Sequence, residues 1–308
     1  MKQSLSTSRL DKAYRSSPIV KIGERSKFVI MSDCHRGLGS WADDFAKNQL
    51  ATLAALKHYF YQDFTYIELG DGDELWENKS FRDITAIHSD IFTLLARFYS
   101  GNRLYMIYGN HDMEKKHNPG LLGTYEDVRR KASLPLFPGI SVYPGIRLHY
   151  GPEALELFLV HGHQTDFFNS SLWRLSRFLV RYFWKPMQMI GYQNPTSAAQ
   201  NNTVKEKTEL RLTKWADDNG IPLIAGHTHR AVFPNPGDGR YFNDGSCVNP
   251  WSITALEISS GEITLVKWGE KTKEDGAVHI GRNIIGGPGR IEDYYLSNER
   301  ADMESAPA

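Results

Sequence analysis

Short apolar runs alternate along this chain with segments of helical periodicity. Residues 40–61 and 83–100 have apolar positions at helical spacing, and Ser40 with Asp43 forms a predicted capping box for the first helix. Five apolar runs have the length and composition of buried strands: KFVIM (27–31), FTYIEL (64–69), RLYMIY (103–108), LELFLV (155–160) and IPLIA (221–225). The order strand, helix, strand, helix, strand predicts an α/β sheet.

The second half of the chain adds an insertion and a hairpin to this pattern. Residues 168–218, between the fourth and fifth runs, are predicted to form a helical, lid-like insertion. The runs ITALEIS (253–259) and EITLVKW (262–268) flank a Ser-Gly pair and predict a β-hairpin. Both ends of the chain are polar. The predicted organisation is therefore a polar N-terminal arm (1–25), one domain (26–268) and a C-terminal extension (269–308).

Composition and charge exclude few classes of protein. The 308 residues carry 36 basic and 36 acidic side chains, so no overall charge favours nucleic acid or a membrane surface. Two cysteines make one disulfide conceivable but do not require it, which favours a reducing compartment. The N-terminus has no apolar signal region, and no run approaches the roughly 18 apolar residues of a spanning helix. We therefore expect a cytoplasmic protein, and nothing in the sequence indicates an obligatory protein partner.

Metal-competent side chains follow all five apolar runs. In an α/β sheet the carboxyl ends of the strands gather at one rim, so residues far apart in sequence can meet there. Imidazole and carboxylate groups suit divalent Mn, Fe, Co or Zn, and a carboxylate can bridge two such ions. Each group alone is more typical of a turn, whereas the ordered set indicates a metal site. Its members are Asp33 and His35; Asp71; Asn110, His111 and Asp112; His161 and His163; and His227 and His229.

This ordered set, read as D-x-H, G-D, G-N-H-D, H and G-H-x-H, resembles the calcineurin-like metallophosphoesterase superfamily over roughly residues 27–250. The resemblance implies a two-sheet α/β sandwich flanked by helices, with a helical insertion. It also implies a phosphoester hydrolase with two divalent metal ions, most often Mn, with Fe, Zn, Co or Ni as alternatives. A hydroxide bridging the two metals would attack phosphorus in line with the leaving oxygen.

The resemblance assigns a role to each site residue. His111 would protonate or stabilise the leaving group, and Asp112 would orient His111. His163 and Asp73 stay open: each could orient a ligand or be a solvated loop residue. The implied ligands are Asp33, His35, Asp71 and His229 for one metal, and Asp71, Asn110, His161 and His227 for the other, with Asp71 shared.

The basic segment 172–190 bears on the substrate. Arg174, Arg177, Arg181 and Lys185 recur there at helical spacing beside apolar and aromatic residues. Such a helix could simply pack on the domain with a solvated basic face. It could instead cover the site or touch a membrane, admitting a substrate with an anionic head and an apolar body. This segment, with GDGDELWEN, HGHQTD and GHTHR, resembles the branch of UDP-2,3-diacylglucosamine hydrolases, peripheral membrane enzymes that cleave a lipid-linked nucleotide-sugar pyrophosphate.

Several other functions remain open at this stage. The chain departs from that branch at His111, where an arginine is usual. A cyclic-nucleotide or nucleic-acid phosphodiesterase is therefore an alternative. A protein Ser/Thr phosphatase is disfavoured, because Tyr108 stands where those enzymes carry an arginine before Gly-Asn-His. An inactive scaffold is disfavoured because every ligand position is filled.

Overall fold

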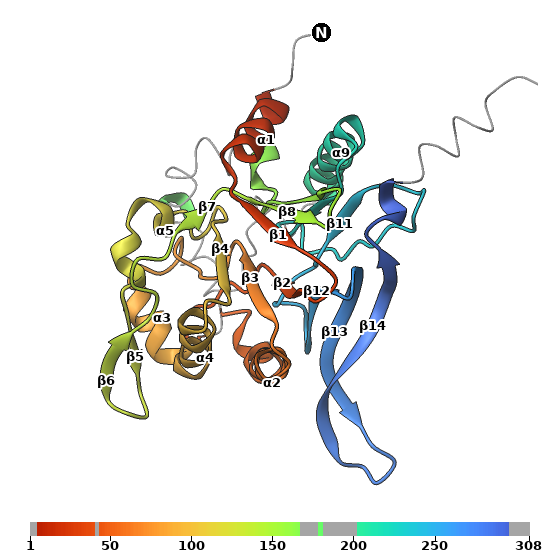
Figure 1. Cartoon of the computed structure of the whole chain (residues 1–308). Coiled ribbons are helices and arrows are strands. Elements are labelled where there is room, and N and C mark those ends of the chain that lie inside the picture. Colours follow the sequence, from red (N-terminus) through yellow and green to blue (C-terminus); the bar gives the residue numbers. More distant parts are fainter. Residues whose placement is uncertain (1–4, 41–42, 167–177, 181–201, 296–308) are drawn as a thin grey trace, which may run out of the picture.

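Two sheets packed face to face form the centre of the computed structural model, which describes residues 5–40, 43–166, 178–180 and 202–295 (Figure 1). Helices cover the outer face of each sheet, so the predicted two-sheet α/β sandwich is confirmed. The larger sheet has seven strands in the order β14-β13-β12-β2-β3-β4-β7. Its strands are β2 (Lys27–Met31), β3 (Thr65–Leu69), β4 (Leu104–Ile107), β7 (Val142–Tyr143), β12 (Ser252–Ser259), β13 (Glu262–Thr272) and β14 (Val278–Arg290).

The smaller sheet has five strands in the order β1-β8-β9-β10-β11. A separate antiparallel hairpin joins β5 (Thr124–Asp127) and β6 (Ala132–Pro135). In the larger sheet β2, β3, β4 and β7 run parallel, and in the smaller sheet β9, β10 and β11 run parallel. The five strands are β1 (Ile19–Ile22), β8 (Ile146–Tyr150), β9 (Leu155–Leu159), β10 (Leu223–Ala225) and β11 (Tyr241–Asn243).

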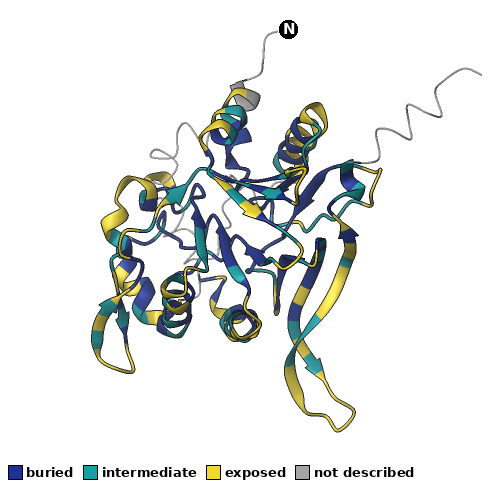
Figure 2. Cartoon of the chain, in the orientation of Figure 1, coloured by how far each residue is buried: buried dark blue, intermediate teal, exposed yellow. Residues whose placement is uncertain are grey.

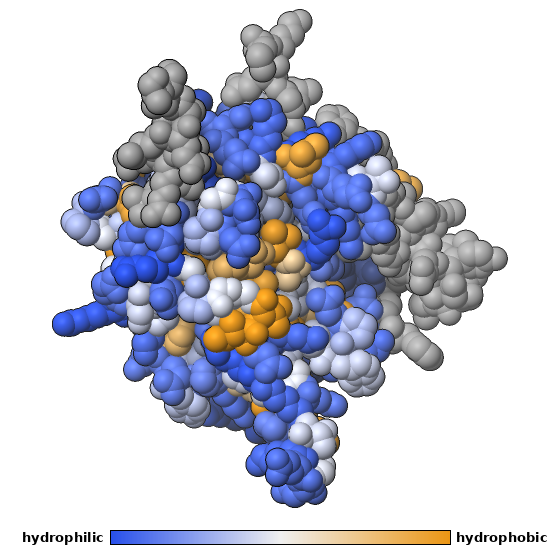
Figure 3. Space-filling view, turned by 90° about the vertical axis from the view of Figure 1, so that its right-hand side faces the viewer, coloured by the Kyte–Doolittle hydropathy of each residue, from blue (hydrophilic) through white to orange (hydrophobic). Residues whose placement is uncertain are grey.

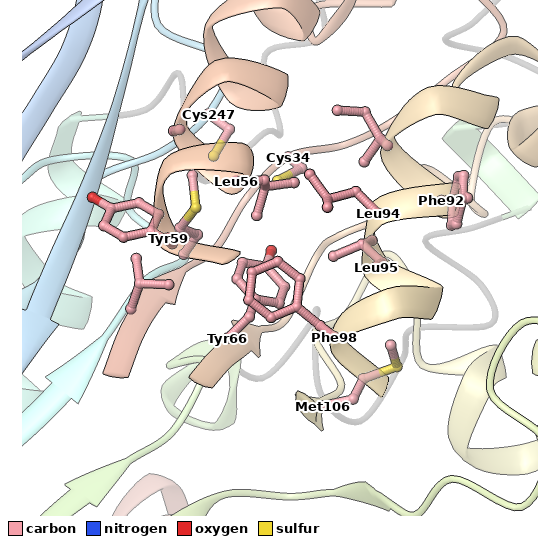
Figure 4. Close-up of a cluster of buried hydrophobic side chains, with 14 of the residues drawn as sticks. Cys34, Leu56, Tyr59, Tyr66, Phe92, Leu94, Leu95, Phe98, Met106 and Cys247 are labelled. Atoms are coloured by element: carbon pink, nitrogen blue, oxygen red, sulfur yellow. The ribbon is translucent and has the colours of Figure 1, made fainter. Parts of the chain in front are cut away.

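Alternation along each strand divides the apolar residues between an inner and an outer layer. Ile30 and Ile67 face the space between the sheets, where they join Leu157 of the opposite sheet. Val29 and Tyr66 point outward from the larger sheet into a second cluster, part of which Figure 4 shows beneath the helices. The helices that close this cluster are α2 (Gln49–Tyr61), α3 (Phe81–Ile87) and α4 (Ser89–Ser100).

The remaining helical segments lie at the outer face of the smaller sheet or in the loops. Helices α1 (Leu5–Ser16) and α9 (Asn202–Asn219) cover that sheet, where Leu10 and Trp215 pack with Phe158. None of the helices in the described ranges is both long and apolar enough to cross a membrane. The short elements are α5 (Glu114–His117) and the 3-10 turns η1 (Ala46–Asn48), η2 (Pro119–Leu122) and η3 (His163–Thr165).

The N-terminal segment is not the polar arm that we expected. From Leu5 it forms α1, in which Leu10 and Ala13 are buried one turn apart against the smaller sheet. It then adds β1 as a strand parallel to β8. Only a narrow apolar stripe faces the sheet, and the polar residues around it conceal that stripe in the sequence.

The C-terminal boundary at residue 268 falls inside a strand. β13 runs through it to Thr272 and pairs along its length with β14, so residues 269–290 continue the larger sheet. The predicted hairpin between β12 and β13 is confirmed, with Ser260 and Gly261 both at positive φ in its turn. Beyond the body the β13–β14 hairpin is exposed over residues 272–279 (Figure 2). The face that carries this hairpin is mostly hydrophilic, with apolar surface near its centre (Figure 3).

Two helix predictions need correction. The helix predicted from Ser40 begins only at Gln49, because the Asp43 carboxylate accepts from the backbone N–H groups of Gly39 and Ala46 and so closes a loop there. The helix predicted over 83–100 is interrupted at His88, whose ring is buried against Asp43 and Gln49.

The predicted insertion, residues 168–218, is described only in part. Its final portion forms α9 and therefore agrees with the helical prediction. Apart from residues 178–180, the rest of the insertion lies outside the described residues, and so does most of the basic segment 172–190.

Candidate metal centre

The carboxyl ends of five parallel strands meet where the two sheets face each other. The loops after β2, β3 and β4 (residues 32–36, 70–76 and 108–115) are called here the β2–β4 loops. Those after β9 and β10 (161–166 and 226–230) are called the β9–β10 loops. The structure groups six of the seven predicted ligands into two clusters whose ligand atoms lie within 4.8 Å of one another: Asp33, His35 and His229, and Asp71, His161 and His227.

Short distances define the first cluster. The Nε2 atom of His229 lies 3.1 Å from Asp33 Oδ1 and 3.3 Å from His35 Nε2. The Nε2 atom of His35 is also 3.6 Å from Asp33 Oδ1. Three potential ligand atoms from two different sheets thus point at one small volume.

Asp71 connects the second cluster to the first. Its Oδ2 atom lies 3.1 Å from His161 Nε2 and 3.9 Å from His35 Nε2. The seventh predicted ligand, Asn110, is 1% exposed. The next residue, His111, donates its backbone N–H to Asp71 Oδ1 over 2.8 Å. This position of Asp71 is what the shared ligand of a two-metal site requires.

Each carboxylate is anchored through one oxygen and leaves the other for a cation. Asp33 Oδ2 accepts from Ser32 Oγ at 2.5 Å and from the backbone N–H of His227 at 2.7 Å. Its Oδ1 atom faces the histidines. Asp71 has the same arrangement, with Oδ1 held by the His111 N–H and Oδ2 facing His161. The anchoring bonds fix the direction of the free oxygens.

Hydrogen bonds also fix the orientation of two imidazole rings. His161 Nδ1 lies 2.9 Å from the carbonyl oxygen of Leu69 and donates to it, so Nε2 is the ring nitrogen that faces the centre. His35 Nδ1 lies 3.0 Å from Glu74 Oε2, which has the same effect. Both rings therefore present Nε2 to the centre, as a metal ligand does.

Four of the predicted ligand atoms are buried and have no hydrogen-bond partner in the described part of the chain. Buried polar atoms without partners are rare in folded proteins and need an explanation. Carboxylate, amide and imidazole atoms directed into one buried space are the donor set of a divalent transition metal. The residues therefore fit two such ions. The four atoms are Asp33 Oδ1, Asn110 Oδ1, His161 Nε2 and His227 Nε2.

Strained backbone accompanies this arrangement. Five of the predicted ligands have φ between 48° and 67°, a region that is costly for side chains other than glycine and that concentrates at functional sites. The loops also approach so closely that two positions have no room for a side chain and are occupied by glycine. A Cβ on Gly109 would lie 2.0 Å from Asp71 Oδ1, and one on Gly226 would lie 2.2 Å from Ser32 Oγ. The five ligands are Asp33, His35, Asp71, His227 and His229.

Burial and neighbouring charges shift the pKa values of ionisable groups at the centre. Burial opposes ionisation of Asp33, but His229 and His161 hold its pKa well below the usual range. Burial also acts against a charged His161, yet the Asp71 and Asp33 carboxylates raise its pKa to about 9. Burial lowers the pKa of His227 to about 3. A cation that binds at His161 Nε2 would take the place of the proton that this raised pKa favours there.

His111 is outside the predicted ligand set, although its ligand atom lies within 4.8 Å of those of His35 and Asp71. Its Nδ1 atom is 2.7 Å from Glu74 Oε2, and its ring stacks on Trp76 with centroids 4.2 Å apart. Burial works against protonation, but Glu74 and Asp71 raise the pKa of His111 above its ordinary value. The side chain stays 24% exposed, so it can meet a substrate.

Glu74 was missed by the sequence analysis. The same Oε2 atom lies 3.0 Å from His35 Nδ1 and 2.7 Å from His111 Nδ1, so this carboxylate joins a predicted ligand to the predicted acid. Its position three residues after Asp71, in the same strand-end loop, was the available signal.

The expected contact between Asp112 and His111 is wrong. Asp112 is fully buried, with Oδ1 accepting from the Gly109 N–H and Oδ2 from the Gly72 N–H and from Lys115. Asp112 therefore joins two of the β2–β4 loops, while Glu74 orients His111. The role that the resemblance implied for Asp112 is not seen here, because these adjacent residues point in different directions.

A buried ion network, which was not predicted from the sequence, lies under the β2–β4 loops. Lys115 Nζ is within 2.9 Å of Glu68, Asp73 and Asp112, and all four side chains are at most 1% exposed. Arg36 pairs with Glu68 and Asp73 at 2.7 Å each. Asp73, left open above, thus belongs to this network and is not solvated.

His163 is also buried rather than solvated, with 2% exposure. Its ring centroid is 5.5 Å from that of His161 and 5.9 Å from that of Tyr108. Its Nδ1 atom has no hydrogen-bond partner among the described residues. Burial, followed by the neighbouring His161, holds the pKa of His163 well below the usual range, so the ring is neutral.

Comparison with known proteins agrees with this geometry. The model of a family described as calcineurin-like phosphoesterase matches residues 26–231, which include all seven predicted ligands. No curated protein matches the chain significantly.

Among solved structures the chain is similar to Vps29 of Chaetomium thermophilum, at 11% identity and a TM-score of 0.38, over 85% of this chain and 96% of Vps29. The same protein complexed with the RaPID-derived cyclic peptide RT-D3 gives 11% identity and a TM-score of 0.32, over 84% of this chain and 95% of that chain.

Proposed function

Since this chain belongs to the calcineurin-like phosphoesterase family, we propose that it is a hydrolase of phosphodiesters or pyrophosphates that uses two divalent metal ions. The observation that carries the proposal is the pair of clusters around Asp71, whose inward-facing ligand atoms include four without a hydrogen-bond partner among the described residues. An inactive relative would have no need to keep such costly groups together.

The proposed ligand sets are those that the sequence implied. Asp71 belongs to both, and Mn²⁺ is the ion that we propose first. Two cations held there would lower the pKa of a shared water and neutralise phosphoryl oxygens. One set is Asp33, His35, Asp71 and His229; the other is Asp71, Asn110, His161 and His227.

Residues of the chain itself would handle the leaving group. The Glu74 carboxylate holds the Nδ1 side of His111 and favours its protonated form. His111 can then give the proton on Nε2 to the departing oxygen as a general acid. Trp76 stacks on the ring and limits its rotation.

For the substrate we propose a diester or pyrophosphate with an anionic head and an apolar body, such as a nucleotide-sugar lipid. The support is the sequence resemblance and the basic, aromatic composition of residues 172–190. We propose that this segment contacts the membrane surface. The protein would then co-sediment with anionic phospholipid vesicles, and deletion of residues 172–190 should abolish that co-sedimentation.

A substrate panel tests the proposal. The protein, purified with Mn²⁺, is assayed on bis-p-nitrophenyl phosphate, a UDP-acylglucosamine, cyclic nucleotides, phospholipid head-group diesters, single-stranded nucleic acid and phosphopeptides. We expect Mn²⁺-dependent hydrolysis of the generic diester and the highest kcat/KM for the lipid-like pyrophosphate. A preference for nucleic acid or cyclic nucleotides would reassign the substrate. Inertness towards every compound, with two metals bound, would refute the hydrolase.

A further inference from the structure

Helix α9 contacts the turn that carries His227 and His229 through one buried carboxylate. Glu209 lies in the third turn of α9 and is 6% exposed. Its Oε1 atom accepts a hydrogen bond from Thr228 Oγ1 at 3.0 Å, and its Oε2 atom pairs with Arg230 Nη2 at 2.6 Å. Thr228 and Arg230 alternate with His227 and His229 in the same short turn, so this carboxylate holds the residues beside two predicted ligands.

The turn that Glu209 contacts needs an external restraint. His227 and His229 have φ values of 67° and 55°, a conformation that persists only where the surroundings impose it. The Thr228 hydroxyl, between them, donates to Glu209 and accepts from Asn243 Nδ2 at 3.2 Å. Its hydrogen-bonding capacity is thus used on both sides, which fixes the rotamer of Thr228 and the turn around it.

The same helix reaches the other histidine-bearing loop. Arg211 Nη1, two residues beyond Glu209, donates to the carbonyl oxygen of Thr165 at 2.7 Å. Thr165 ends the 3-10 turn that follows His161. Leu212 is fully buried in the cluster that seats α9 on the smaller sheet. α9 therefore restrains both β9–β10 loops from a single rigid support.

We infer that Glu209 is a positioning residue for the metal centre and that α9 is a structural component of the site. This inference rests on the proposed function, because it concerns the residues that would hold the metals. His229 belongs to the first ligand cluster and His227 to the second. Loss of the Glu209 contacts should therefore weaken both sites together rather than one of them.

The test measures Mn²⁺ binding by titration calorimetry and by metal analysis after gel filtration, for full-length protein. Glu209→Ala should lower Mn²⁺ affinity by about 10- to 100-fold, the usual effect of removing a group that orients metal ligands. Glu209→Gln keeps an acceptor for Thr228 but loses the charge that faces Arg230, so its loss should be smaller. The electron paramagnetic resonance signal of the coupled Mn pair should weaken in the same order.

Two further variants separate positioning from general stability. Lys214→Ala removes an exposed ion pair with Asp218 from the same helix and should leave Mn²⁺ affinity unchanged. Thr228→Val removes the hydroxyl but leaves α9 intact, and it should reproduce part of the loss even where Glu209→Ala fails to fold.

The outcomes distinguish the two levels of inference. Wild-type protein that binds no Mn²⁺ contradicts the proposed function. Wild-type protein that binds two ions, with unchanged affinity in the folded Glu209 and Thr228 variants, contradicts the positioning role alone. A loss in Lys214→Ala equal to that in Glu209→Ala also overturns it, since the effect would then be general to the helix.

Discussion

The β2–β4 loops and the β9–β10 loops supply comparable ligands but are held in different ways. The β2–β4 loops are tied together from within, by the buried network of Arg36, Glu68, Asp73, Asp112 and Lys115. The β9–β10 loops are restrained mainly from outside, by Glu209 and Arg211 of α9.

The difference follows from where each group of loops lies. The β2–β4 loops succeed one another on neighbouring parallel strands of one sheet, so their own side chains can interlock beneath the ligands. β9 and β10 are also neighbours, but a long insertion separates them in sequence, and its last helix seats beside both loops. Buried ion pairs thus stabilise the β2–β4 loops. Contacts with helix α9 stabilise the β9–β10 loops.

The largest expected effect belongs to Asp71, the residue that connects the two clusters. Asp71→Asn keeps the shape of the side chain but removes the charge between the two proposed cations, so the proposed diesterase activity should fall by at least about 10²–10³-fold. Activity on bis-p-nitrophenyl phosphate with saturating Mn²⁺ measures it. The exposed Asp44→Asn is the matched control. If Asp71→Asn keeps wild-type activity, the hydrolysis does not take place at this site.

Next is the stability of the β2–β4 loops. Lys115→Met leaves Glu68, Asp73 and Asp112 buried without their ammonium partner, which should lower the free energy of unfolding by about 3–5 kcal/mol. Glu209→Ala should cost less, about 1–3 kcal/mol, because it breaks two hydrogen bonds at the edge of the fold. Urea unfolding checks both, with exposed Lys47→Met as control. If both variants lower the free energy of unfolding equally, the two groups of loops do not differ in how strongly they are held.

A variant of His111 distinguishes the proposed proton transfer from metal binding within the β2–β4 loops. His111→Asn should lower kcat by at least about 10²-fold, because the proposed general acid is lost. Mn²⁺ stoichiometry should stay at the wild-type value, since His111 lies outside the proposed ligand sets. His117→Asn, an exposed histidine in the following helix, is the control. Loss of a metal in His111→Asn would instead make it a ligand.

Metal removal should affect the two groups of loops unequally. At a free Mn²⁺ concentration 100 times the Kd, binding stabilises the folded state by about 2.7 kcal/mol, and chelation should remove that contribution. Hydrogen exchange after chelation should accelerate more at residues 226–230 than at residues 70–73, where the ion network remains. Uniform acceleration would show that the network gives the β2–β4 loops no independent stability.

The smallest effect concerns Asp43, which lies between β2 and α2 in sequence. Burial raises the pKa of Asp43, but hydrogen bonds from His88 and from backbone N–H groups outweigh it and hold this pKa below the usual 3.8. Ionised Asp43 therefore stabilises the fold above about pH 4, and the contribution disappears as the pH falls through the lowered pKa. Asp43→Asn should cost about 1–2 kcal/mol at pH 7. Its difference from wild type should shrink at pH 3 in urea unfolding, and a constant difference would contradict the assignment.

The sequence predicted most of the site because the ligands are local to recognisable strand ends. Each of Asp33, Asp71 and His161 follows an apolar run closely, and parallel strands bring such positions together. The groups that hold them could not be identified in this way. Lys115 is fully buried while Lys116 beside it is exposed, and nothing in EKKH distinguishes the two.

Glu209 and α1 escaped prediction for a related reason. Glu209 is one of several charged residues in a polar helix, and its role depends on a turn 19 residues away. The apolar stripe of α1 is narrow, so Leu10 and Ala13 read as isolated residues until the sheet supplies a surface for them. In both cases the information lies in the packing of distant elements rather than in local pattern.

The clusters also join distant parts of the chain. His35 and His229 come from opposite sheets and are 194 residues apart in sequence. With the proposed metals bound, such contacts would act as a reversible cross-link that closes a very long loop. Proteases should therefore cut the chelated protein sooner, and returning Mn²⁺ should restore resistance, so that cation supply would set the lifetime of the protein as well as its proposed activity.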